Sequence, residues 1–344
     1  MKQLEVEPMR VTNHQVRLAA RPVGLPKATD WSFTEETVGE PVEGNFLVKV
    51  LYISLDPAMR GCMNEGRSYM PPVAINEVMR ALAVGRVIAS RHPEFAVGDF
   101  VSGPFGAQEY ALSDGNAVMK VDPAVAPLPA HLGVLGMTGK TAYFGLLDVG
   151  RPQPGETVVV SAAAGAVGSV VGQIARLKGC RAVGIAGGGE KCRYLVDDLG
   201  FDAAIDYKSE DVRAALKQHC PKGIDVYFDN VGGDILEAAL GRLARHARIV
   251  ICGAISQYNV TGPQRGPSNY MALLVNRASM TGFLVGDYAA RNAEATAALA
   301  GWLADGSIKS REDIMKGLRS FPDAFGRLFT GENLGKLVLE VATE

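Results

Sequence analysis

The sequence lacks the features that would assign it to a membrane, secreted or nucleic-acid-binding class. No stretch approaches the ~18 uninterrupted apolar residues that a membrane-spanning helix needs, and the first ten residues, MKQLEVEPMR, are charged rather than apolar. Charge of one sign is also missing, because 35 basic and 37 acidic residues give a net charge of −2 and form no run of five. These absences argue against a membrane or nucleic-acid partner and favour a small-molecule substrate.

Cysteine and histidine are scarce and scattered. The five cysteines form no CxxC pair, and none of the five histidines stands at metal-ligand spacing from a cysteine or glutamate. The sequence therefore predicts no metal site. An odd number of dispersed cysteines also favours a reducing compartment, so we expect a cytoplasmic protein.

A chain of 344 residues with 47% hydrophobic composition can fill two cores, so two domains are expected. From Thr157 onward, β-branched runs alternate with helix-period segments, which predicts an α/β domain with a doubly wound, six-stranded parallel sheet. The predicted strands are Thr157–Ser161, Arg181–Ala186, Ala203–Asp206, Ile224–Asp229, Arg248–Cys252 and Ala278–Val285.

The two ends of the chain have a different pattern. Short β segments broken by Gly and Pro turns predict a barrel-like module before this domain, with strands at Phe46–Ile53, Ala83–Ser90 and Phe100–Val101. The last residues predict helices at Arg311–Gly317 and Phe321–Phe329 and a strand at Lys336–Val341 that needs a sheet to join. We therefore expect domains at 1–127 and 128–309, with 310–344 returning to the first.

One strand-to-helix turn of the α/β domain carries a glycine pattern. The segment after Ser161 matches G-x-G-x-x-G with Ala163 in the first glycine place, followed by Gly165 and Gly168. Gly165 lets a pyrophosphate approach the backbone, Gly168 lets the helix lie close to the strand, and the amides near the helix start favour an anion. The turn predicts a dinucleotide cofactor, and its alternative reading is a tight turn without function.

The next strand indicates which dinucleotide is bound. In NAD-binding folds an acid about 20 residues after the last loop glycine contacts the ribose 2′-hydroxyl, but this place holds Gly187–Gly189. Lys191 follows and suits a 2′-phosphate. Glu190 is the counter-evidence unless it lies in the first turn of the next helix, and Lys191 could be an ordinary solvated lysine. The pattern favours NADP.

Eight motifs together resemble the zinc-free branch of the medium-chain dehydrogenase/reductases, and within it the NADPH-dependent double-bond reductases. They are YISLDPAMRG (Tyr52–Gly61), GRSYMPP (Gly66–Pro72), LGMTGKTAYFGLLDVG (Leu135–Gly150), SAAAGAVGSVVGQIA (Ser161–Ala175), EKCRYL (Glu190–Leu195), FDNVGG (Phe228–Gly233), CGAISQYN (Cys252–Asn259) and GENLGK (Gly331–Lys336).

This resemblance implies a GroES-like β-barrel substrate domain, a Rossmann NADP-binding domain, a cleft between them and a homodimer paired along the Rossmann sheets. It places substrate beside Tyr258, Tyr69 and Ala58. The cofactor contacts that it implies, together with those of the glycine turn, are Met137, Thr138, Ala163, Gly165, Ala166, Val167, Gly168, Gly187, Lys191, Tyr207, Asn230, Cys252, Tyr258, Phe283 and Asn333. The family often has a bulky aromatic at the place of Ala58 and a proline at that of Thr138, so the substrate shape stays open.

Without a metal, another group must stabilise the charge that hydride transfer leaves on an acceptor oxygen. An α,β-unsaturated ketone or aldehyde suits this, because hydride at the β-carbon gives an enolate, which the Tyr258 hydroxyl can stabilise before a proton reaches the α-carbon. The alternatives are a quinone reductase of the same superfamily, a non-catalytic NADPH-binding structural or sensor protein, and an alcohol dehydrogenase. An alcohol dehydrogenase is the least favoured alternative, because this sequence has neither the zinc ligands nor the Tyr-x-x-x-Lys pair that such enzymes use.

Overall fold

The computed structural model describes residues 10–66 and 68–343, which form two compact units. The parallel unit comprises Gly133–Asp313 and Phe329–Lys336, and the antiparallel unit comprises the described residues up to Leu132, Ile314–Leu328 and those from Leu337 onward. The ends of the expected domains at 1–9 and Glu344, and Arg67 of the GRSYMPP motif, lie outside the described residues.

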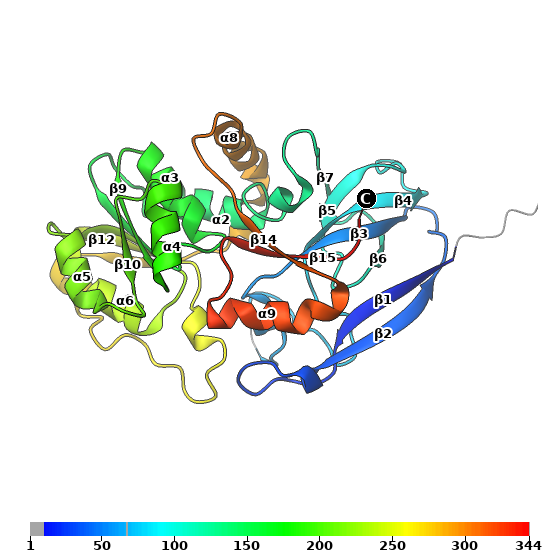
Figure 1. Cartoon of the computed structure of the whole chain (residues 1–344), viewed down its shortest axis with the longest axis horizontal. Helices are drawn as coiled ribbons and strands as arrows, with labels where there is room; N and C mark the ends of the chain where they lie inside the picture. Colours follow the sequence, from blue (N-terminus) through cyan, green and yellow to red (C-terminus); the bar gives the residue numbers. More distant parts are fainter. Residues whose placement is uncertain (1–9, 67, 344) are drawn as a thin grey trace, which may run out of the picture. The chain divides into compact units, whose positions relative to one another are not determined.

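The parallel unit contains the predicted six-stranded sheet, whose neighbours all pair in parallel (Figure 1). The strand order is β10-β9-β8-β11-β12-β13. The strands are β8 (Thr157–Ser161), β9 (Arg181–Ala186), β10 (Ala203–Asp206), β11 (Ile224–Asp229), β12 (Leu243–Ile251) and β13 (Ser279–Gly282). The sequence predicted the first four bounds correctly, placed the start of β12 five residues late and made β13 too long.

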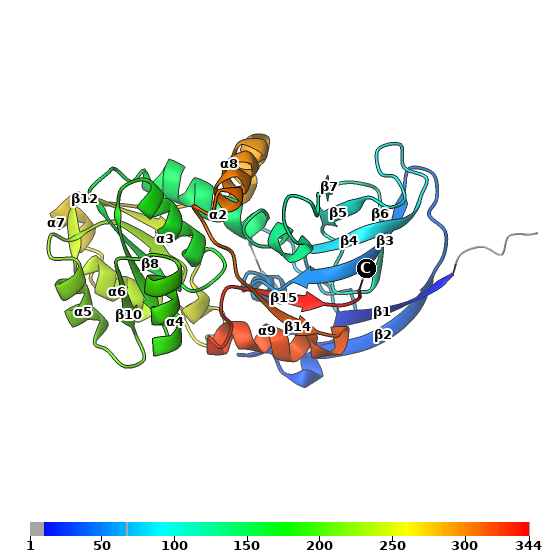
Figure 2. The same cartoon turned by 45° about the horizontal axis from the view of Figure 1, so that its top comes forward.

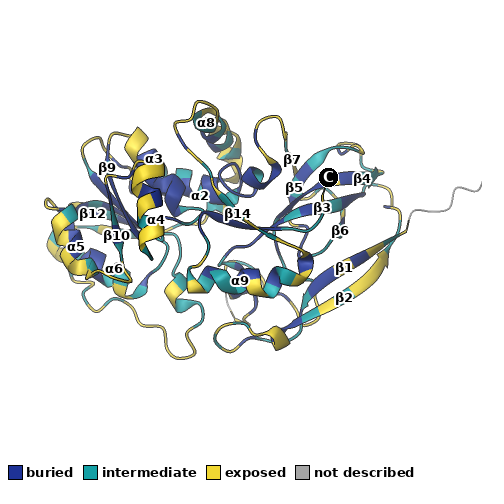
Figure 3. Ribbon diagram, in the orientation of Figure 1, coloured by how far each residue is buried: buried dark blue, intermediate teal, exposed yellow. Residues whose placement is uncertain are grey.

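Helices lie on both faces of this sheet, as the turned view shows (Figure 2). The helices of this unit are α2 (Met137–Phe144), α3 (Gly168–Leu177), α4 (Gly189–Arg193), α5 (Val212–His219), α6 (Gly233–Leu240), α7 (Ala272–Asn276) and α8 (Asn292–Ala304). Because both faces are covered, the sheet of this unit is largely buried (Figure 3). In β8, all five residues are buried. From β8 the chain continues to β9 and β10 on one side, and β11, β12 and β13 follow on the other side of β8. The strand order therefore reverses between β8 and β11, and the carboxyl ends of these two strands are the usual place for a ligand in such a sheet.

The antiparallel unit contains a two-stranded ribbon and a seven-stranded sheet. The ribbon pairs β1 (Val11–Leu18) with β2 (Trp31–Val38), and the sheet has the order β14-β15-β3-β4-β5-β7 with β6 paired to β3. Its first strands are β3 (Phe46–Ser54), β4 (Ala83–Ser90), β5 (Phe100–Gly103), β6 (Tyr110–Ser113) and β7 (Met119–Lys120), and its short helix is α1 (Met59–Cys62). This arrangement agrees with the expected fold class.

The C-terminal segment corrects one prediction and confirms two. Residues 311–317, expected to be helical, form strand β14 (Glu312–Lys316), which pairs with β15 (Lys336–Glu340). The sequence Glu-Asp-Ile-Met-Lys contains good helix formers, but pairing with a neighbouring strand outweighs this weak local preference. Helix α9 (Phe321–Thr330) forms as predicted, and β15 joins β3 antiparallel, so the terminal strand completes a sheet begun by the N-terminal module.

Candidate nucleotide-binding site

The turn from β8 to α3 contains two glycines with different surroundings. Gly168 is closely packed, whereas Gly165 has open space beside it. A Cβ on Gly168 would lie 2.4 Å from the carbonyl oxygen of Ala162, so no larger residue fits there. A Cβ on Gly165 would meet only that same oxygen, at 3.2 Å. Because the rest of the protein leaves Gly165 open, its missing side chain leaves room for a ligand to approach the backbone.

The turn also presents hydrogen-bond donors. Ala162 adopts a left-handed backbone with φ +48°, and its carbonyl oxygen accepts the amide of Gly165 at 2.9 Å. Within the described part of the chain, the amides of Ala166 and Val167 donate to no backbone oxygen. Two amides beside the start of a ten-residue helix suit a phosphate, so this turn fits the pyrophosphate of a dinucleotide.

A second segment, far along the chain, lies against this turn. The amide of Gly335 donates to the carbonyl oxygen of Ala164 at 2.9 Å, and Gly335 forms a parallel bridge with Gly165. The side chain of Asn333 bonds within the same loop, from its Nδ2 to the carbonyl oxygen of Gly335 at 3.1 Å. The structure therefore brings the loop that carries Asn333 beside the glycine turn.

The adenosine end of the site lies at the loop after β9. Glu190 occupies the first turn of α4 and is exposed, so the Gly187–Gly189 loop carries no carboxylate. Lys191 Nζ donates to the carbonyl oxygen of Gly331 at 2.8 Å, and the hydroxyl of Tyr207 is 3.8 Å from the place where Gly331 would carry a Cβ. Lys191 and Tyr207 therefore both lie near Gly331.

The ends of β8 and β11 are joined by a buried polar network. Ser161 Oγ donates to Asp229 Oδ1 at 2.9 Å, and Oδ1 also accepts the hydroxyl of Tyr227 and the amides of Val231 and Gly232. Burial raises the pKa of the Asp229 carboxyl, although these donors act in the opposite direction. The network holds the two strand ends at the edge where the nicotinamide half of a dinucleotide is expected.

Asn230 takes part in this junction. Its backbone N–H donates to Ser161 Oγ, and its side-chain Nδ2 donates to the carbonyl oxygen of Ser161, each at 2.8 Å. The backbone N–H and one N–H of Nδ2 are therefore used in positioning the strands, which leaves the side-chain oxygen and the second N–H of Nδ2 as the groups that a cofactor could contact.

Tyr258 is folded back over the end of β12. Its hydroxyl accepts the amide of Ala254 at 3.2 Å and lies 3.0 Å from the position of a Cβ on Gly253. Burial raises the pKa of the Tyr258 phenol and raises that of the neighbouring Cys252 thiol to about 12. Both groups are protonated at neutral pH, so Tyr258 can donate its proton in a hydrogen bond, whereas Cys252 is a neutral thiol.

The remaining expected contacts have different surroundings. Ala163 is fully buried beneath the turn, and Thr138 is buried with its hydroxyl donating to the carbonyl oxygen of Gly133 at 3.0 Å. Met137 begins α2 and is partly exposed. Phe283 packs against Gly145 and lies edge-on to Phe228. Packing is therefore a sufficient explanation for Phe283, while Met137 remains available to a ligand.

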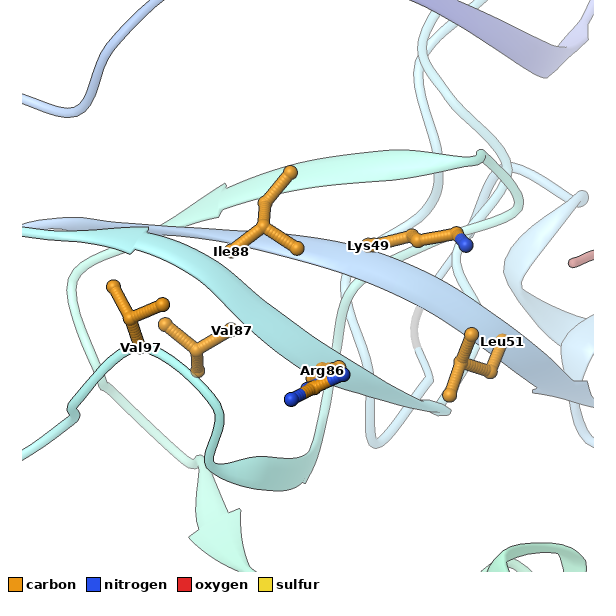
Figure 4. A pocket seen from close by; sticks show the side chains of 6 residues that line it. All are labelled: Lys49, Leu51, Arg86, Val87, Ile88 and Val97. Carbon is orange, nitrogen blue, oxygen red and sulfur yellow. The ribbon is translucent and has the colours of Figure 1, made fainter. Parts of the chain in front are cut away.

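Two of the three expected substrate residues, Ala58 and Tyr69, belong to the antiparallel unit. Ala58 precedes α1 and is partly exposed, and Tyr69 is 59% exposed. The same unit has a shallow hollow on its sheet, lined by Lys49 and Leu51 of β3, by Arg86, Val87 and Ile88 of β4, and by Val97 (Figure 4). Its volume of about 270 Å³ is below the ~300–1,000 Å³ of usual ligand pockets, and no predicted site residue lines it.

Sequence reasoning missed several residues that shape the site. Ser161 and Asp229 were seen only as strand residues, and Asp206 and Gly331 were not considered as site residues. A polar residue ending an otherwise apolar strand was the available signal for the first three.

The described residues contain no group of three or more His, Cys, Asp or Glu side chains able to hold a metal ion, and no helix among them is long and apolar enough to span a membrane.

A doubly wound parallel sheet with a glycine turn between β8 and α3, together with a separate antiparallel unit, is the architecture of a medium-chain dehydrogenase/reductase. Two family models match: the N-terminal domain of oxidoreductase over residues 14–121 and zinc-binding dehydrogenase over residues 166–302. Despite the second description, the described residues contain no zinc-ligand set.

Individual relatives identify the branch. NADPH-dependent curcumin reductase of Escherichia coli is 44% identical over 96% of this chain and 97% of its own, and the NADP(+)-dependent 2-alkenal reductase of Nicotiana tabacum is 41% identical over 97% and 99%. The solved structure of CurA from Vibrio vulnificus in complex with NADPH is 46% identical, covers 96% of this chain and 100% of its own, and has a TM-score of 0.92. The chain belongs to the double-bond reductase branch of this family.

Proposed function

We propose that this protein uses NADPH to reduce the carbon–carbon double bond of α,β-unsaturated ketones or aldehydes. Family membership supports the reaction class, and the observation that carries the cofactor choice is the convergence of Lys191 and Tyr207 beside a loop without carboxylate. A 2′-phosphate is stabilised by an ammonium, so Lys191 favours NADPH over NADH at this end of the site.

NADPH would supply the hydride for this reaction. The residues of the chain would bind and orient the cofactor and stabilise the enolate. The amides of Ala166 and Val167 would hold the pyrophosphate, with Gly165 leaving space for it. Lys191 and Tyr207 would hold the 2′-phosphate. The junction of Ser161 and Asp229 would support the nicotinamide half, because it ties together the strand ends at that edge.

Tyr258 is the group proposed to stabilise the enolate. Its hydroxyl already accepts the Ala254 amide, so its own proton remains to be donated to a substrate oxygen. The raised pKa of the phenol keeps this proton in place at neutral pH. Tyr69 and Ala58 are also proposed to contact the substrate.

Labelled cofactor tests the reaction. With NADPH carrying deuterium at the transferred position, we expect deuterium on the β-carbon of an enone and solvent hydrogen on the α-carbon. Deuterium on the carbonyl carbon would instead identify an alcohol dehydrogenase. A parallel screen of alkenals, enones and quinones distinguishes the quinone reductase alternative, and the absence of NADPH oxidation with every acceptor would favour a structural or sensor protein.

We also propose that the protein is a homodimer paired along the parallel sheets. Strand β13 ends the sheet, so one of its edges has no strand partner among the described residues. The adjacent helix α7 exposes apolar side chains, including Leu274 at 70% and Val275 at 71%. Exposed apolar residues beside a sheet edge are typical of an interface that a second subunit covers.

A further inference from the structure

Strand β10 ends beside the glycine loop that joins β9 to α4. Asp206, its last residue, pairs in register with Ala186, and the amide of Tyr207 donates to the carbonyl oxygen of Ala186 at 3.1 Å. A Cβ on Gly187 would lie 2.9 Å from the ring and hydroxyl of Tyr207, so Gly187 has to be glycine for the ring to lie there. The two residues at the end of β10 therefore face the loop that is expected to contact the adenosine ribose.

The carboxylate of Asp206 is engaged by three donors. Oδ1 accepts the amides of Gly188 at 2.7 Å and of Lys208 at 3.0 Å, and Oδ2 accepts the hydroxyl of Ser209 at 2.9 Å. The Gly188 amide is the main cause of the lowered pKa of this carboxyl, so Asp206 is ionised at neutral pH. Its negative charge opposes a nearby 2′-phosphate, while the three donors stabilise that charge and hold both oxygens toward the protein.

The bond to Gly188 acts on the start of α4. Gly188 precedes the helix with φ +97°, a conformation that L residues rarely adopt, although a Cβ there would contact nothing within 4 Å. The requirement at Gly188 is therefore one of backbone conformation rather than space. An acceptor that holds this amide determines where α4 begins, and Lys191 is the third residue of that five-residue helix.

We propose that Asp206 is a positioning residue for the 2′-phosphate of NADPH. By holding the Gly188 amide it sets the start of α4 and the place of Lys191, while the next residue, Tyr207, supplies the opposite side of the same site. Asp206 thus favours NADPH over NADH without touching either. This inference rests on the NADPH preference proposed above. It adds a residue whose negative charge, taken by itself, would suggest a preference for NADH.

The test measures binding, so it does not depend on the reaction. Dissociation constants of NADP⁺, NAD⁺ and adenosine 2′,5′-bisphosphate are determined by calorimetry for the wild type, Asp206→Ala and Asp206→Asn. We expect Asp206→Ala to weaken NADP⁺ and the bisphosphate about fivefold or more, as for the loss of a hydrogen bond, and NAD⁺ less than twofold. Asp206→Asn keeps an oxygen for both amides and should restore at least half of the lost affinity on a logarithmic scale.

A double-mutant comparison tests whether Asp206 acts through Lys191. In a Lys191→Ala background, Asp206→Ala should weaken NADP⁺ less than twofold, because the contact that it positions is already absent. Full additivity would overturn the proposal, as would equal weakening of NADP⁺ and NAD⁺, an Asn variant as weak as the Ala variant, or no effect of Asp206→Ala. Asp206→Ser replaces Asp206→Ala, with the same expected ratios, if the alanine protein does not fold.

The outcomes separate this inference from the proposed function. If the wild type binds NADP⁺ and the bisphosphate tightly but reduces no enone, the proposed reaction is wrong and the Asp206 comparison still stands. If the enone is reduced but Asp206→Ala leaves the ratio of NADP⁺ to NAD⁺ affinity unchanged, only the role of Asp206 is wrong.

Discussion

Lys191 Nζ donates a hydrogen bond to the carbonyl oxygen of Gly331, 2.8 Å away and 140 residues later in the sequence. Together with the hydrogen bond from the Gly335 amide to Ala164, this contact ties Phe329–Lys336 to the parallel unit, although the segments on either side belong to the antiparallel unit. The loop supplies Gly331 near Lys191 and Asn333 near the glycine turn, so it borders both halves of the expected cofactor site.

Removing the ammonium of Lys191 should affect NADPH selectively. For Lys191→Ala we expect the Michaelis constant for NADPH to rise roughly tenfold or more, in line with ~1.5–3 kcal/mol for a hydrogen bond to a charged group, and that for NADH to change little. Steady-state kinetics with one enone and both cofactors measure this. Lys217→Ala, at an exposed position of α5, is the control. Equal losses with both cofactors would contradict the assignment.

Removing only the hydroxyl of Tyr258 should affect turnover. For Tyr258→Phe we expect kcat to fall by ~10- to 1000-fold, the range for losing one oxyanion donor or general acid, while NADPH affinity barely changes. Tyr270→Phe, at a 60% exposed tyrosine, is the matched control. Because the variant also loses the bond to the Ala254 amide, its thermal unfolding should be measured. A loss below threefold would reduce Tyr258 to a wall of the pocket.

The pH dependence of turnover gives a second measurement on Tyr258. Burial raises the pKa of its phenol above the ordinary value of about 10, so the proton-donating form is present below that pH and is lost only as the pH rises through the raised value. We expect kcat to show no decline from this group up to pH ~10. A decline centred near pH 8 that is absent in Tyr258→Phe would contradict the raised pKa.

Lys140 on α2 should be a site of stabilising substitution. Its side chain is 4% exposed, no hydrogen bond or ion pair of its ammonium is found among the described residues, and burial lowers its pKa. The charged form therefore destabilises the fold at neutral pH, and stability should rise as the pH increases through the lowered pKa toward the unfolded value of about 10.5.

Replacing Lys140 by methionine should remove this penalty. We expect Lys140→Met to raise the melting temperature at pH 7 by about 2–4 °C, as for ~1 kcal/mol, with a smaller gain near pH 10. Thermal unfolding at both pH values, with Lys217→Met as the control, measures it. A lower melting temperature at pH 7 would show that the ammonium makes a stabilising interaction.

Catalysis should not require a metal ion. After dialysis against a strong chelator we expect the rate of enone reduction to stay within experimental error of that of the untreated enzyme, because the proposed charge stabilisation comes from Tyr258. The metal content of the dialysed protein is measured in parallel. Activity that is lost and then restored by zinc would overturn the metal-free interpretation.

Helix α7 should be part of the dimer interface. Leu274→Glu places a charge on its exposed apolar surface, so we expect this variant to sediment as a monomer at concentrations where the wild type is a dimer. Val23→Glu, at a 76% exposed position of the antiparallel unit, is the control and should remain dimeric. A monomeric wild type, or a dimeric Leu274→Glu protein, would contradict the proposal.

The sequence by itself determined the central strands and the glycine turn. The runs that form β8, β9, β10 and β11 are mostly apolar, contain β-branched residues and are bounded by turn residues, so their bounds follow from local pattern. The placement of Gly168 also follows locally, because a helix that starts directly after a buried strand must pack closely on it.

Tertiary structure decided the rest. Residues 311–317 become a strand only because β15 offers a partner edge, and no local signal shows that pairing. The contacts of Lys191 with Gly331 and of Asp206 with Gly188 join residues 140 and 18 positions apart. Such contacts depend on which strands lie side by side and on where a late loop returns, and hydrogen-bond geometry between distant segments is set by packing rather than by local sequence.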